Sequence, residues 1–154
     1  MDDVTSSGLY VEFYKNKVYQ AKHSAMSLNP SEGQEWASRW DRLYEALSAE
    51  PRRMIIASLR DEPEGRRLPL PEAADSPNRP EDAAKLGKQL RHHHLPLLAE
   101  AGYVRWEQEP FIVQRGPRFE EPECIIDLVT DSIDELPMSL INNCKIFRDR
   151  VNDD

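Results

Sequence analysis

The sequence predicts an α+β fold that is mainly helical. Apolar residues recur every three to four positions over residues 31–60, 82–101 and 122–136, the period of a helix that buries one face. Residues 103–115 instead alternate between apolar and polar positions, the period of a β-strand. Clusters of proline and glycine separate these stretches. With 154 residues, the chain is long enough for one domain with a hydrophobic core.

Residues 1–30 are expected to form an N-terminal β arm. Aromatic and β-branched residues surround Lys15-Asn16-Lys17 within residues 9–20, which is the composition of a short hairpin or of one extended strand. Two strands alone bury too little surface to be stable in water. We therefore expect the arm to lie on the rest of the chain or on a partner.

Residues 31–60 are expected to form two helices. Four apolar side chains at spacings of four, three and four share one face of the first helix: Trp36, Trp40, Leu43 and Leu47. Ser48 stands before Glu50-Pro51, so we expect it to cap the second helix. That helix ends near the proline- and glycine-containing segment 61–65.

Residues 66–101 begin irregularly and end in a long helix. We expect a short extended piece at 68–70, a brief helix from 71 to 74 and a loop from 75 to 80. Over residues 82–101, one side of a helix collects the apolar residues and one histidine: Ala83, Leu86, Leu90, His93, Leu97 and Ala101. The opposite side carries Lys85, Lys88, Arg91 and His92. Pro96 lacks a backbone donor, so a kink is expected near Leu95, and Gly102 ends the helix.

Two strands and a C-terminal helix complete the chain. The strands lie within residues 103–109 and 111–115 and are joined around Glu109-Pro110. Residues 120–154 form a helical extension with more apolar surface than one small domain covers. We expect this helix, with residues 36–47, to form an isologous homodimer interface through five apolar side chains: Ile125, Ile126, Val129, Ile133 and Leu136. The alternative is that the helix folds back and completes the core of its own chain.

The order of elements over residues 31–119 is that of a winged helix-turn-helix domain. Two segments support this fold assignment. Residues 94–104 read HLPLLAEAGYV, and residues 47–59 read LSAEPRRMIIASL. Both resemble runs in arsenical-repressor-type transcription regulators, and the His-Leu-Pro form on an acidic background is similar to winged-helix domains of haloarchaea. The resemblance spans about residues 40–119 and implies a cytoplasmic DNA-binding regulator. The Cys-Val-Cys metal motif of the metal-sensing relatives is absent, so it implies no metal site.

Positive charge gathers where a DNA-binding face is expected. Residues 79–118 carry seven Lys and Arg against five Asp and Glu, a balance of +2, whereas the whole chain has a net charge of −8. We expect five side chains to enter the major groove of double-stranded DNA: Lys85, Lys88, Gln89, Arg91 and His92. We expect Arg105, Arg115 and Arg118 to hold phosphates from the wing. The alternative is a protein–protein interaction module without DNA binding, which the overall acidity and the wing residues Glu107 and Glu109 favour.

Other classes of protein find little support. No phosphate-binding glycine loop or serine elbow indicates an enzyme or a cofactor. Three consecutive histidines, 92–94, point about 100° apart on a helix and cannot all bind one metal ion. Cys124 and Cys144 are too few for a disulfide scaffold and are expected to be ordinary thiols. No apolar run approaches the roughly 20 residues that cross a bilayer. A third hypothesis is a regulator that responds to a small molecule. Such a protein would need a ligand pocket, which the sequence does not reveal.

Overall fold

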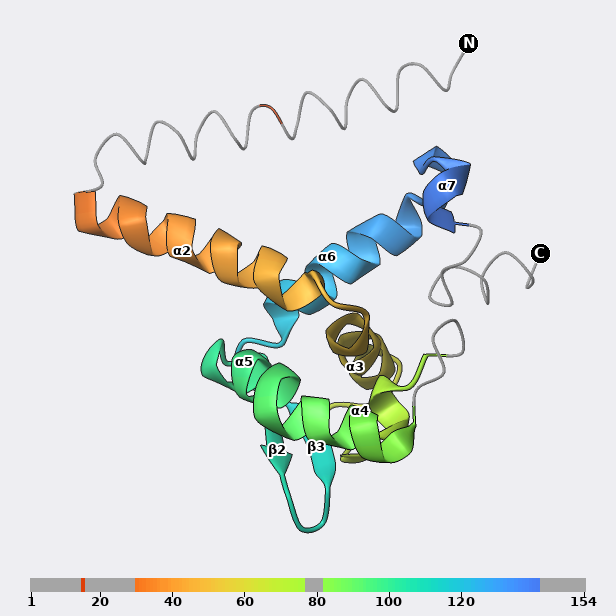
Figure 1. Cartoon of the computed structure of the whole chain (residues 1–154). Coiled ribbons are helices and arrows are strands. Elements are labelled where there is room, and N and C mark those ends of the chain that lie inside the picture. The colour runs from red at the N-terminus through yellow and green to blue at the C-terminus, as the bar shows by residue number, and fades with distance from the viewer. Residues whose placement is uncertain (1–14, 16–29, 77–81, 142–154) are drawn as a thin grey trace. The chain divides into compact units, whose positions relative to one another are not determined.

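The computed structural model describes residue 15 and residues 30–76 and 82–141 (Figure 1). The chain divides into two compact units, Met1–Asp41 and Arg42–Asp154. Helix α2 (Pro30–Leu47) crosses the boundary between them. The β arm expected at 1–30 lies outside the described residues except for Lys15 and Pro30, which are both helical. Residues 77–80 of the expected loop and Cys144 also lie outside them.

Helix α3 (Glu50–Arg60) follows α2, as predicted, but Ser48 does not cap it. The residue at the cap is Ala49, whose side chain makes no capping bond. The Ser48 hydroxyl instead donates to the carbonyl of Glu45 at 2.7 Å and accepts a hydrogen bond from Arg52 at 2.9 Å. The hydroxyl therefore donates a hydrogen bond at the end of α2 and accepts one from a buried arginine.

Three short strands form one antiparallel sheet in the order β1-β3-β2. They are β1 (Leu68–Pro69), β2 (Val104–Glu107) and β3 (Ile112–Arg115). The hairpin β2–β3 pairs Val104 with Arg115 and turns over residues 108–111, as the sequence predicts. Between β1 and the long helix lies the 3-10 helix η1 (Glu72–Ala74), at the position expected for a brief helix.

The long helix of residues 83–100 contains a π-helical turn in its middle. It consists of α4 (Ala83–Gln89), the π-helix η2 (Leu90–His94) and α5 (Leu95–Glu100). The N–H of Leu95 donates to the carbonyl of Leu90, five residues back. Pro96 has no N–H to give to the carbonyl of His92, which is why the regular pattern is interrupted near the expected kink.

The π-helical turn changes which histidine is buried. The prediction that His93 packs in the core is wrong: His93 is exposed, and His94 is 8% exposed. Because the wide turn adds one residue, the buried face continues at His94 and Leu98 where a regular helix would bury His93 and Leu97.

The hydrophobic core of the second unit lies between α3, the long helix and the sheet. It includes buried residues from each of these elements: Ile55, Ile56, Leu59, Leu86, Leu90, Leu95, Leu98, Tyr103, Val104 and Val113. The chain continues as α6 (Glu120–Asp131), η3 (Ile133–Glu135) and α7 (Met138–Ile141). Phe119 and Ile126 add the start of α6 to the core. The described protein is thus mainly helical with one small antiparallel sheet.

Two tryptophans of the segment expected in the dimer interface, residues 36–47, are exposed in the single chain. Trp36 is 63% exposed and Trp40 is 38% exposed, and their rings meet edge to face on α2 at 6.3 Å. Leu43, on the same helix, is buried. No described helix combines the length and the apolar character that a bilayer crossing requires.

Candidate nucleic-acid interface

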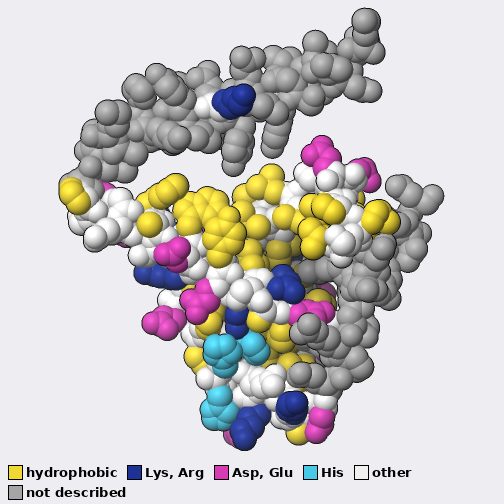
Figure 2. Space-filling view, turned by 45° about the horizontal axis from the view of Figure 1, so that its top comes forward, with side chains coloured by type: hydrophobic (Ala, Val, Ile, Leu, Met, Phe, Trp, Pro, Cys, Tyr) yellow, Lys and Arg dark blue, Asp and Glu magenta, His cyan; other side chains and the backbone are white. Residues whose placement is uncertain are grey.

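The outer face of α4 carries two exposed lysines, Lys85 and Lys88. Its inner face is fixed in the core by Leu86, and Leu90 continues that face into η2. The Asp82 carboxylate accepts a hydrogen bond from the backbone N–H of Ala84 at 3.2 Å and caps the start of the helix. The two lysines therefore project from a helix whose orientation is set by buried side chains. In the view of Figure 2, Lys, Arg and His side chains lie toward the lower end beside Asp and Glu side chains, and further Lys and Arg side chains lie higher up.

The remaining residues expected on this helix lie in three different surroundings. Gln89 is half-buried and lines a pocket of about 370 Å³ at the start of α3. The guanidinium of Arg91 lies over the Phe111 ring, 4.0 Å from its centroid, and joins the helix to the hairpin. His92 is exposed. Lys85, Lys88 and His92 thus form the solvent face, and Arg91 stands at its edge.

The hairpin presents both signs of charge. Arg105 and Glu107 are exposed and alternate with Trp106, so they share the solvent face of β2. Trp106 meets Phe111 edge to face at 6.4 Å. Arg118 is exposed just after β3, whereas Glu109 is exposed in the turn. Arg105 and Arg118 are available to an anion, but the carboxylates near Arg105 reduce its effect.

Arg115, expected to hold a phosphate, is engaged within the protein instead. Its Nη2 donates to the carbonyls of Leu59 at 3.0 Å, Arg60 at 3.3 Å and Glu62 at 2.8 Å. Its Nη1 lies 3.5 Å from the Glu123 carboxylate. A helix end leaves its last carbonyls without helical partners, and Arg115 donates to two of them, those of Leu59 and Arg60, and to Glu62 just beyond α3. Its two terminal nitrogens are therefore used within the protein, and its buried Nε has no hydrogen-bond partner among the described residues.

A buried arginine, Arg52, organises the other side of the long helix. It is 3% exposed and donates to the carbonyls of Glu45 and Ala46 at 2.8 and 3.0 Å. Its Nη1 lies 2.8 Å from Nδ1 of His94 and 3.5 Å from Nε2 of His93. Arg52 thereby links the end of α2, the start of α3 and the π-helical turn.

His94 is held neutral by these surroundings. Burial lowers its pKa to about 4, and the neighbouring Arg52 guanidinium adds to the shift. Because Arg52 only donates, Nδ1 of His94 must accept, which assigns the ring proton to Nε2. The sequence offered one signal for this pair: Arg52 falls on the apolar face of α3 with Ile55 and Leu59. A cation on such a face requires a buried partner.

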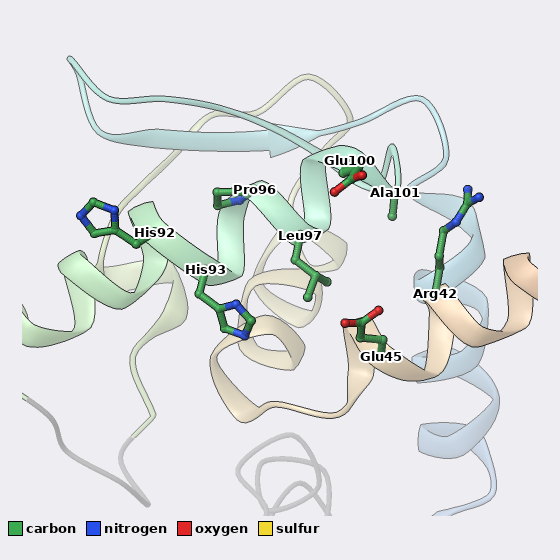
Figure 3. Close-up of a pocket in the computed structure, with 8 residues that line it drawn as sticks. All are labelled: Arg42, Glu45, His92, His93, Pro96, Leu97, Glu100 and Ala101. Atoms are coloured by element: carbon green, nitrogen blue, oxygen red, sulfur yellow. The ribbon is translucent and has the colours of Figure 1, made fainter.

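A groove of about 550 Å³ lies between the end of α2 and the η2–α5 segment. Glu45 and Glu100 present carboxylates on opposite sides of Leu97, and His92 points away from them (Figure 3). Arg42 and His93 complete the polar lining. Among the residues that the structure describes, no three His, Cys, Asp or Glu side chains are grouped so that they could hold a metal ion.

The five residues expected in a dimer interface separate into two groups. Ile126 is buried against its own chain, and Ile125 packs against the same core. Val129 is exposed, and Ile133 and Leu136 are partly exposed. One face of α6 therefore completes the core of its own chain, as the alternative proposed, while another remains at the surface.

No protein family model matches the chain, and neither a curated protein nor a solved structure matches it. A functional assignment therefore rests on the geometry of the site.

Proposed function

We propose that this protein is a DNA-binding transcription regulator of the winged helix-turn-helix type. In this assignment α3 is the first helix, η1 and α4 form the helix-turn-helix, and β2–β3 is the wing. The sheet order β1-β3-β2 is compatible with it. The observation that carries the proposal is a core-anchored helix that exposes Lys85, Lys88 and His92 directly before an antiparallel hairpin.

The basic side chains set what kind of DNA binding to expect. Lys85, Lys88, Arg105 and Arg118 are the exposed cations of the helix and hairpin. Each phosphate contact contributes about 0.9 to the slope of log affinity against log salt concentration. Four contacts would give a slope of about −3 to −4. Binding should be weak and strongly salt-dependent on random duplex, and tighter on an operator.

The proposal is tested with the charge-reversal variant Lys85→Glu with Lys88→Glu. Both side chains are exposed, so the fold should be retained. We expect affinity for a mixed-sequence duplex, measured by fluorescence anisotropy over a potassium chloride series, to fall at least about 100-fold. The slope should decrease by about two units because two phosphate contacts are lost.

Arg66→Glu with Arg67→Glu is the matched control. It changes the net charge by the same amount, and both residues are exposed before β1. Both arginines precede β1, an edge strand that pairs Leu68 with Val113, and β3 separates this strand from Arg105 on β2. The weak Arg66–Glu62 pair, at 3.8 Å on the surface, contributes little to stability. The control should bind DNA nearly as the parent does.

A protein-binding module on the same fold is the second candidate. The internal engagement of Arg115 and the exposed Glu107 and Glu109 favour it, because they leave the wing with little positive charge. A parent protein that binds no duplex at low salt, or a Lys85, Lys88 double variant that binds as the parent does, would contradict the DNA-binding assignment and support this one.

A further inference from the structure

A pocket of about 370 Å³ lies between the start of α3, the segment that ends η1, and the long helix. It shares no lining residue with the groove of Figure 3. Apolar side chains line it from three elements: Pro51 of α3, Ala74 of η1 and Leu86 of α4. Its volume is within the range of sites that hold small organic molecules. A small ligand in this pocket would contact apolar side chains from all three elements.

His94 contributes an unused hydrogen-bond donor to this pocket. The side chain is 8% exposed, and its Nδ1 accepts a hydrogen bond from Arg52 at 2.8 Å, so its Nε2 carries the proton. This N–H has no hydrogen-bond partner among the described residues, where the fully buried polar side-chain atom without a partner is Nε of Arg115. Nε2 of His94 is therefore open to accessible space, and His94 lines this pocket. A donor in such a position needs an acceptor from outside the chain.

The arginine behind His94 makes this donor attractive to an anion. Arg52 is 3% exposed, and the acceptors of its described hydrogen bonds are neutral carbonyls, a hydroxyl and imidazoles. Burial lowers the pKa of Arg52, and the Glu45 carboxylate, which forms no described ion pair with it, opposes that shift. A buried charge is costly unless an opposite charge compensates it. Arg52 also polarises the imidazole, which strengthens Nε2–H as a donor.

The charges around the pocket favour a ligand with one negative charge. Arg53 is half-buried in the lining, and Glu50 is the carboxylate there, accepting a hydrogen bond from the Ser76 hydroxyl. With the buried Arg52, two guanidinium groups stand against one carboxylate, so one positive charge remains. The start of α3, where Ala49 provides no side-chain cap, adds partial positive charge. A monoanion therefore suits this pocket better than a dianion such as phosphate.

We propose that this pocket binds a small organic monocarboxylate, whose carboxylate accepts a hydrogen bond from Nε2 of His94 and whose apolar part packs against Pro51, Ala74 and Leu86. Gln89, which is half-buried in the lining, supplies a second donor. A phosphate of a DNA backbone does not fit this role, because a rigid duplex does not reach a side chain as buried as His94. The site needs no DNA and is independent of the proposed DNA binding.

The test is isothermal titration calorimetry of the full chain without DNA, at about pH 7.5, well above the pKa of about 4 that keeps His94 neutral. The probe is 3-phenylpropanoate, and the comparison compounds are its neutral amide, acetate and inorganic phosphate. We expect 3-phenylpropanoate to bind with a Kd below about 1 mM. The comparison compounds should bind at least about 10-fold more weakly. The amide lacks the charge, acetate lacks the apolar part, and phosphate is mainly a dianion.

Two variants test the lining. His94→Asn keeps an acceptor for Arg52 but removes Nε2–H, so it should bind 3-phenylpropanoate at least about 10-fold more weakly. Gln89→Glu is nearly isosteric and places a second carboxylate in the pocket, so it should lower the affinity by a similar factor. Gln108→Glu, the matched control, makes the same change at an exposed position of the hairpin turn and should bind as the parent does. Circular dichroism checks each fold, and Gln89→Glu decides if His94→Asn unfolds.

Nuclear magnetic resonance of the imidazole nitrogens locates the ligand directly. Adding 3-phenylpropanoate to the parent should shift the Nε2 resonance of His94 more than the resonances of the other histidines, because the carboxylate accepts its hydrogen bond. A parent that does not bind 3-phenylpropanoate, or that binds a comparison compound equally well, would overturn the inference. Unchanged affinity in a folded His94→Asn or Gln89→Glu variant, or a shift confined to other histidines, would overturn it as well.

Discussion

Acidification should destabilise this protein through one buried imidazole, His94. The pKa of His94 is about 4 in the folded protein, against about 6.5 in an unfolded chain. As the pH falls, the unfolded chain therefore takes up the proton first. The stabilisation from the neutral ring is complete above about pH 6.5 and is lost between about pH 6.5 and pH 4. A protonated ring would also lie 2.8 Å from the Arg52 guanidinium with no lone pair left to accept its hydrogen bond.

The expected loss can be calculated from the two pKa values. A shift of about 2.5 units corresponds to about 3 kcal/mol when both states are fully titrated. Between about pH 7.5 and pH 5, the part that is lost is about 2 kcal/mol. This loss is a large share of the free energy of unfolding of a typical folded domain, which is about 5–15 kcal/mol.

The measurement is urea unfolding at several pH values for the parent and for His94→Asn. The Asn side-chain oxygen can accept from Arg52 near the position of Nδ1, but it does not titrate. At about pH 7.5 we expect the variant to be less stable by about 1–2 kcal/mol because a buried ring is lost. At about pH 5 this difference should nearly disappear, since only the parent loses the His94 contribution.

The two proteins differ only at His94, so the comparison isolates this ring and its contacts with Arg52 and His93. Equal loss of stability in the parent and in His94→Asn between these pH values would refute the reasoning. It would mean that His94 keeps an ordinary pKa or loses its contact with Arg52 in solution.

Two further predictions concern residues that hold the sheet to its neighbours. Arg115→Met should lower the free energy of unfolding by about 2–3 kcal/mol, because the carbonyls at the end of α3 lose a charged donor. Its salt slope for DNA should match the parent's, and a reduced slope would show that Arg115 binds phosphate after all. Gly116→Ala should cost about 2–3 kcal/mol in thermal or urea unfolding, since its Cβ would lie 2.5 Å from the carbonyl oxygen of Gly102. Gly33→Ala is the control, because a Cβ at this exposed position of α2 meets nothing within 4 Å. This substitution should be neutral or should stabilise the protein by up to about 1 kcal/mol. Similar losses of stability for both glycines would contradict the steric argument.

The order and type of the described elements were determined by local sequence. The turn around Glu109-Pro110 follows from a change of hydrophobic period between proline and glycine breakers. Lys85 and Lys88 face solvent while Leu86 and Leu90 face the core, as regular helical spacing requires. These features depend on neighbours in the chain, so periodicity was sufficient to predict them.

The tertiary structure alone decided three other features. Pro96 accounts for the interruption of the long helix, but the packing of this helix against α3 places His94, and not His93, in the core and gives Arg52 a partner 42 residues away. Arg115 is drawn from the expected DNA face to the end of α3 because carbonyls there lack partners. Helix α6 divides its apolar residues between the core and the surface according to where α3 meets it. Backbone carbonyls carry no signature in the sequence, and which of them need a donor depends on which distant segments pack together.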